Sequence, residues 1–132
     1  MKESGFSLIE LMVVLSIISL LSCFAYPAYS RYWMQLKRLE ARLMLLEGRI
    51  QLEKYAASSY RGYKGAGVQD LTLAHSSQNK WYTLALEGVN ETEYTLIAKP
   101  IFKDLSCSEL SCNAKNERFY KGQGSYHDCW GD

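Results

Sequence analysis

Residues 5–30 of this chain read GFSLIELMVVLSIISLLSCFAYPAYS, and this segment limits the possible folds more than any other. Its last twenty residues, 11–30, carry no charged side chain, which is enough apolar sequence for a helix to cross a lipid bilayer. One carboxylate, Glu10, stands at the head of this run. Because a carboxylate in the hydrocarbon core costs about 2.5–3.5 kcal/mol on insertion scales, we expect Glu10 to have a partner or a function.

Two other interpretations of the N-terminus leave part of it unexplained. A secretory signal peptide begins with a positively charged region, but here the charge of Lys2 is offset by Glu3. The run Leu20-Leu21-Ser22-Cys23 resembles a lipoprotein processing box, with Cys23 as the lipidated residue. Neither interpretation, nor that of a plain membrane anchor, accounts for the Gly-Phe junction and the acid that follows it.

The length and charge of the chain limit what the rest of it can do. Its 132 residues leave room for one modest globular domain. With 15 basic against 14 acidic residues, the overall charge supports no argument for an anionic partner. The charge is unevenly spread: residues 31–64 hold eight bases and three acids, a net of +5, and residues 65–132 hold six bases and nine acids, a net of −3.

We expect a single helix that begins at Phe6 and ends near Ser58-Ser59, because between Phe6 and Ala57 only Pro27 would stop a helix outright. Its first half is apolar on every side. In its second half, apolar residues recur at steps of three and four and form one face, with others beside it, while charged residues such as Arg38 take the remaining faces. The apolar face consists of Leu36, Leu39, Leu43, Leu46 and Ile50, with Leu45 and Leu52 beside it.

Four later segments are rich in β-forming residues and predict a small antiparallel sheet. A loop-rich connection at 58–79 comes first, and the expected strands are residues 80–86, 94–99, 110–113 and 118–121. The expected fold class is therefore α+β. It combines one long N-terminal helix, with an apolar half and an amphipathic half, and a packed antiparallel sheet of about four strands.

The N-terminal pattern resembles that of type IV prepilins. A short hydrophilic leader, a Gly-Phe junction, an acid at the fifth position after the junction and an undivided apolar helix occur together. The resemblance implies that a prepilin peptidase cleaves between Gly5 and Phe6 and that Phe6 is N-methylated. It also implies that Glu10 pairs with an N-terminal amine as helices bundle in a fibre. Family members usually carry a helix-loosening glycine where this chain has Ser19.

The same resemblance implies a division of the chain and a location for each part. Residues 1–5 would be the leader, residues 6–30 the transmembrane and assembly helix, and residues 31–132 a periplasmic globular pilin domain. The implied partners are other pilins, major and minor, the prepilin peptidase and the inner membrane, and assembly would move the subunit to an extracellular pilus. The implied type IV pilin fold agrees with the helix and sheet expected from periodicity.

The C-terminal part resembles a subfamily of minor pilins in which two cysteines close the C-terminal loop onto the sheet. The resemblance rests on residues 94–100, on Cys107-x-x-Leu110, on Lys121-Gly122 and on Cys129-Trp130. It implies a disulfide between Cys107 and Cys129, with Cys112 left free. A zinc site is the alternative that the residues alone leave open, although its spacing is that of no known ribbon or finger; its ligands would be Cys107, Cys112, His127 and Cys129.

The sequence shows no catalytic constellation, no phosphate-binding glycine loop and no defined pair of carboxylates, so we expect no enzymatic activity, cofactor or metal. We expect a minor pilin, a structural subunit of a type IV pilus that serves adhesion, twitching motility or DNA uptake. Two alternatives share this N-terminus: a pseudopilin of a type II secretion system and a DNA-receptor minor pilin of a competence pilus.

Nucleic-acid contact, if there is any, is expected at Arg61 and Lys64, where basic and aromatic residues mix. Because the net charge of +5 over residues 31–64 is balanced by −3 over the remainder, we expect the globular part to show no binding of duplex DNA at physiological salt.

Overall fold

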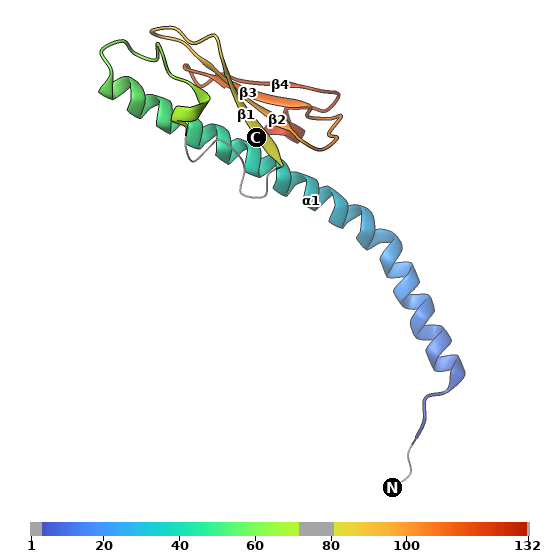
Figure 1. The fold of residues 1–132 in the computed structure, drawn as a ribbon. Coiled ribbons are helices and arrows are strands. Elements are labelled where there is room, and N and C mark those ends of the chain that lie inside the picture. Colours follow the sequence, from blue (N-terminus) through green and yellow to red (C-terminus); the bar gives the residue numbers. More distant parts are fainter. Residues whose placement is uncertain (1–3, 72–80, 132) are drawn as a thin grey trace. The chain divides into compact units, whose positions relative to one another are not determined.

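The computed structural model describes residues 4–71 and 81–131, and the chain divides into two compact units, Met1–Gln35 and Leu36–Asp132. One helix, α1 (Leu8–Ser58), passes from the first unit into the second, as Figure 1 shows. Its bounds confirm the long helix expected from periodicity to within two residues, and the helix continues through Pro27.

The first unit is an apolar helix, and none of its described residues, 4–35, is buried. Val14 is the least exposed of its large apolar side chains between residues 8 and 24, and it is still 48% exposed. The hydroxyls of Ser16, Ser19 and Ser22 each donate to the carbonyl four residues earlier at 2.8 Å, which satisfies these polar groups within the helix. By length and composition this helix can cross a membrane.

The second unit joins the rest of α1 to a four-stranded antiparallel sheet. The strands are β1 (Tyr82–Glu87), β2 (Thr95–Pro100), β3 (Glu109–Asn113) and β4 (Arg118–Lys121), and they lie side by side in chain order (Figure 1). Two short helices complete it, the 3-10 turn η1 (Val68–Asp70) and α2 (Tyr126–Trp130). The expected α+β fold and the four expected strands are confirmed, each to within two residues at either end. Sequence periodicity did not predict α2.

The core of this unit lies between α1 and one face of the sheet. Gly48 faces Leu96, since a Cβ built at this glycine would lie 3.1 Å from Leu96 Cδ1 and 3.5 Å from Leu84 Cδ2. Gly48 therefore lets the helix approach the strands closely. The fully buried residues include Ala41, Leu45 and Leu52 of α1 and Tyr82, Leu96, Ala98 and Leu110 of the strands.

The apolar face expected on α1 is not the face that packs on the sheet. Leu39, Leu43, Leu46 and Ile50 are 42–51% exposed, whereas the buried helical residues are Arg38, Ala41, Met44, Leu45, Gly48 and Leu52. At 100° per residue the two sets lie on opposite sides of the helix. The sheet packs on the side of α1 that carries the small residues Ala41 and Gly48, because the helix and the strands can approach each other more closely there. Arg38, expected on a charged outer face, is buried.

Candidate functional site

The N-terminal residues expected to be processed lie at the start of α1. Ser7 stands before the first turn, where its Oγ accepts a hydrogen bond from the N–H of Ile9 at 3.3 Å. The carboxylate of Glu10 turns back and accepts the N–H of Ser7 through Oε2 at 2.9 Å. The bond from Ser7 N–H to Glu10 is one half of a helix capping box, and it holds the Glu10 carboxylate close to the Gly5–Phe6 junction.

Gly5 and Phe6 are exposed, and Phe6 is 87% exposed. A Cβ built on Gly5 would meet no other described atom within 4 Å. Within the described residues, the fold therefore gives no steric reason for glycine at this position. Gly5, Phe6 and Glu10 thus lie in one short segment at the start of α1. The cleavage and methylation at Gly5–Phe6 and the pairing of Glu10 stay predictions.

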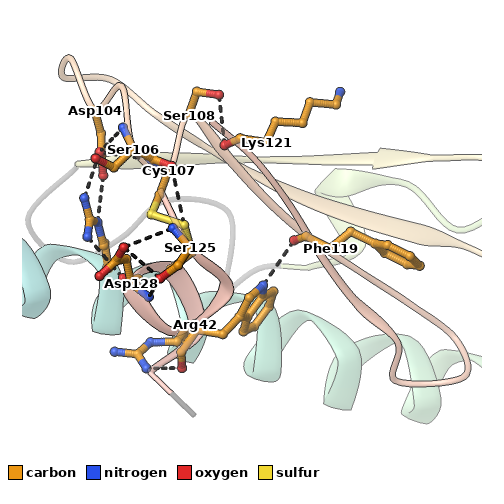
Figure 2. Close-up of a disulfide and its surroundings, with 12 residues drawn as sticks. Arg42, Asp104, Ser106, Cys107, Ser108, Phe119, Lys121, Ser125 and Asp128 are labelled. Atoms are coloured by element: carbon orange, nitrogen blue, oxygen red, sulfur yellow. Dashed lines mark hydrogen bonds and ion pairs between the residues drawn. A yellow bond between two sulfur atoms is a disulfide. The ribbon is translucent and has the colours of Figure 1, made fainter. Parts of the chain in front are cut away.

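The expected disulfide is present in the structure. Cys107 and Cys129 are bonded, with their Cα atoms 5.6 Å apart, and both side chains are fully buried. The bond joins the loop after β2 to α2, as Figure 2 shows. Because Cys107 and Cys129 are bonded to each other, they cannot both serve as thiolate ligands of the alternative zinc site. Among residues 4–71 and 81–131, no group of three His, Cys, Asp or Glu side chains could hold a metal. Cys112 is free and buried on β3.

A buried ion pair that the sequence did not reveal lies beside the disulfide (Figure 2). Arg38 contacts both oxygens of Asp104, with Nε to Oδ2 and Nη2 to Oδ1 each at 2.9 Å. Its Nη1 also donates to the carbonyl of Asp128 in α2 at 3.1 Å. Asp104 Oδ1 in turn accepts the N–H of Cys107 at 3.1 Å. One arginine of α1 thus connects both sides of the disulfide to the helix.

The helix α2 has local signals that could have been found in the sequence. Ser125 is its N-cap and accepts the N–H of Asp128 at 3.2 Å, while Asp128 Oδ2 accepts the N–H of Ser125 at 3.0 Å. The N–H of Ser125 and its hydroxyl, at 2.8 Å, both donate to Asp128 Oδ2, and these two bonds hold the pKa of the Asp128 carboxyl below its usual value. The pattern Ser-x-x-Asp is an N-terminal helix signal. The helix positions Trp130, whose Nε1 donates to the carbonyl of Phe119 at 3.2 Å (Figure 2).

The two basic residues considered for nucleic-acid contact lie on one turn after α1. Tyr63 anchors this turn from within: its hydroxyl donates to Glu53 at 2.9 Å, and its ring packs edge-on against Tyr94 with centroids 4.7 Å apart. Burial, together with the adjacent Glu53 carboxylate, raises the pKa of Tyr63 to about 12. Arg61 and Lys64, on either side of Tyr63, are exposed.

The backbone of the same turn is fixed by glycine. Gly62 has a φ of +63°, and a Cβ there would lie 2.0 Å from the carbonyl oxygen of Glu91 in the β1–β2 loop. The turn therefore packs directly on that loop and displays Tyr60, which is 98% exposed. We term Tyr60, Arg61 and Lys64 the basic turn. An acid lies beside it, because Lys64 Nζ is 3.9 Å from the Glu91 carboxylate.

His127, the remaining histidine of the alternative zinc site, lies exposed on α2.

Comparison with known proteins matches two family models, which together cover residues 1–114. The prokaryotic N-terminal methylation motif matches residues 1–26. The family described as type IV minor pilin ComP, DNA uptake sequence receptor, matches residues 27–114. A methylation motif followed by an apolar helix fits anchoring in the inner membrane and subsequent assembly into a pilus.

The chain is also similar to a characterised pilin. It is 38% identical over 72 residues to the type IV major pilin protein PilE of Neisseria gonorrhoeae, and the match covers 54% of this chain and 40% of that protein. The chain thus matches less than half the length of this relative. On the family match over more than half of its length, with the fold described above, the chain belongs to the ComP family of type IV minor pilins.

Proposed function

We propose that this minor pilin is cleaved between Gly5 and Phe6 and enters a type IV pilus through its N-terminal helix. The observation that supports this most is the methylation motif over residues 1–26, which covers the apolar start of α1, where every large apolar side chain between residues 8 and 24 is at least 48% exposed. Packing among the described residues does not require glycine at position 5, because a Cβ there would meet no other atom within 4 Å. A peptidase that requires a bare backbone at the cleavage site accounts for it.

The test is expression with a prepilin peptidase, followed by intact-mass measurement. The expected product lacks residues 1–5, and Gly5→Leu blocks the cleavage because a branched side chain does not fit the peptidase. Cys23→Ser is the control and leaves processing unchanged, since it removes only the thiol that a lipoprotein pathway would modify. Cleavage that requires Cys23, or that is unaffected by Gly5→Leu, would contradict the proposal.

Glu10 has the assembly role in this proposal. In the structure it caps its own helix through Ser7, so its carboxylate already lies beside the residues that would carry the new amine. In low dielectric an amine and a carboxylate each offset the desolvation of the other. We expect Glu10→Ala to leave the chain inserted and folded but to lower its recovery in sheared pili. Unchanged recovery would show that the carboxylate is not an assembly contact.

We also propose that the globular unit contacts DNA through the basic turn. The support is the description of the matched family as a DNA uptake sequence receptor, together with the outward display of Tyr60, Arg61 and Lys64 by the anchored Tyr63. Domain charge alone led us to expect no DNA binding. A near-neutral domain can still carry a positive surface, because the local potential depends on where the charges lie. The even charge of the domain therefore does not argue against a basic turn that contacts DNA.

The test is fluorescence anisotropy of a labelled DNA duplex with the full-length chain in detergent micelles, repeated over a salt series. We expect saturable binding that weakens with salt, and Arg61→Ala with Lys64→Ala should flatten the salt slope by about one unit for each phosphate that is no longer neutralised. Lys121→Ala is the matched control, since Lys121 is exposed on β4 and pairs with Glu109 at 2.9 Å. Absence of saturable binding, or an equal effect of the control, would refute the proposal.

A further inference from the structure

An exposed row of apolar residues follows the side of α1 that faces away from the sheet. Leu36, Leu39, Leu43, Leu46 and Ile50, here termed the leucine stripe, follow one another at steps of three, four, three and four. This is the spacing of the a and d positions of a coiled coil. Four of the five are 42–51% exposed, and Leu36 is half-buried. A continuous apolar row of this kind marks an interaction surface.

The charges beside the leucine stripe are sorted by sign. Glu40 and Glu47 each follow a d-position leucine and lie along one edge, whereas Arg42 and Arg49 each precede an a-position residue and lie along the other. These are the e and g positions, whose charges select partner and orientation in coiled coils. In a parallel pair of identical helices, the g edge of each lies against the e edge of the other. In an antiparallel pair, equal edges meet, and here equal edges carry equal charge.

The basic edge also borders a hollow. A cavity of about 220 Å³ is lined by Arg42, Arg49 and Arg118 together with three leucines of the stripe, and no carboxylate lines it among the described residues. Arg42 donates through Nη1 to the carbonyl of Trp130, and Arg49 donates through Nη1 to Asn116 Oδ1 at 2.7 Å. The Nε atoms of Arg42 and Arg49 are buried without a hydrogen-bond partner within the described chain. Such a cluster of guanidinium groups is complementary to a carboxylate.

We propose that two copies of this chain pair in parallel along the leucine stripe, with Glu47 of each copy placed at the Arg42 hollow of the other. The inference rests on the proposed function in one respect: membrane insertion through the N-terminal helix gives both copies the same direction. The leucines argue against DNA as the occupant, because phosphate contacts would leave them exposed. A second copy covers the leucines and at the same time places an acid, Glu47, at Arg42, since one chain carries both charged edges.

The test is disulfide crosslinking of the full-length chain in membranes, in a Cys23→Ser background. Leu43 is an a position, so Leu43→Cys should give a dimer on mild oxidation, because equal a positions face each other in a parallel pair. Lys99→Cys is the matched control, since Lys99 is exposed on β2 within the same unit. A dimer yield at position 43 no greater than at position 99 would overturn the proposal. A crosslink that forms only to a different pilin would overturn it as well.

Charge reversal tests the pairing of the edges. In the Leu43→Cys chain we expect Glu47→Arg to lower the dimer yield several-fold, because bases then stand on both edges. Adding Arg42→Glu should restore the dimer yield, because each edge then again faces the opposite charge. If Glu47→Arg lowered the yield only by damaging the fold, a second substitution would not restore it. Failure of the double variant to recover while Cys107–Cys129 remains formed would contradict the assigned pairing. Repeating the crosslink with Gly5→Leu separates this proposal from processing, since the uncleaved chain should still pair in the membrane.

Discussion

Arg38 is a charged residue of α1 whose role is to hold the fold together. Its guanidinium and the Asp104 carboxylate are both buried, at 8% and 2% side-chain exposure. Removing one partner of such a pair leaves the other charge buried without compensation, which costs about 3–5 kcal/mol. We expect Arg38→Met to lower the free energy of unfolding by that amount in chemical denaturation. Arg38→Met with Asp104→Leu should recover much of the loss, and equal stability of single variant and parent would contradict this.

Cys112 is expected to be inert in the folded chain. Burial raises the pKa of its thiol from 9.0 to about 11, and the thiolate is the form that reacts with alkylating reagents. At mildly alkaline pH, native Cys112 should therefore resist iodoacetamide and react promptly in denaturant, as peptide mass spectrometry would show. Labelling at equal rates in the two states would contradict the burial.

The same shift sets the sign of a pH effect on stability. The folded chain holds the Cys112 proton to higher pH than the unfolded chain does, so this contribution to stability is full below the ordinary pKa of 9.0. It is lost as the pH rises toward about 11. Tyr63 acts in the same direction at still higher pH, because its pKa is raised to about 12. Stability should thus fall on the alkaline side, and Cys112→Ala should reduce that fall.

At the scale of elements, the approach of α1 to the sheet depends on Gly48. A side chain larger than methyl would collide with Leu96 and Leu84, and overpacking of a filled core costs about 1–3 kcal/mol. We expect Gly48→Leu to lower the free energy of unfolding within that range in urea. Lys54→Leu is the control on an exposed position of the same helix and should change it little. Equal effects of the two variants would show that helix and sheet are not in close contact at Gly48.

The sequence predicted the elements better than it predicted their packing. Strand composition placed all four strands, and the lack of any helix breaker apart from Pro27 placed α1, because both signals are local. Periodicity picked out one apolar row of α1 but did not say which side meets the sheet; the sheet packs on the other side, which carries the small residues Ala41 and Gly48. The row that periodicity favoured instead became an exposed surface.

The candidate sites likewise divide into those that local sequence patterns indicate and those that only the fold brings together. Motif spacing singled out Gly5, Phe6 and Glu10, whose processing and assembly roles stay predictions, and family resemblance supplied the Cys107–Cys129 pair that the structure contains. The Arg38–Asp104 pair joins residues 66 positions apart, so nothing local in the sequence indicates that either charge is buried. The short helix α2 was missed because five residues are too few for periodicity, although its cap was readable.

At the scale of the whole molecule, the two units differ in where their contacts lie. The second unit, Leu36–Asp132, has a core closed by a disulfide and a buried ion pair. The first, Met1–Gln35, presents apolar side chains without burying them. A helix of this kind is stable only in lipid or against other helices. The chain is therefore built to move from a membrane to an assembly of like helices.

The most direct test of that claim is the mass of the N-terminal peptide of this chain, recovered from pili sheared from cells and purified. We predict a peptide that begins at Phe6 and carries one methyl group on its amine. A chain that is absent from the pili, that still begins at Met1, or that begins at a lipid-modified Cys23 would contradict it.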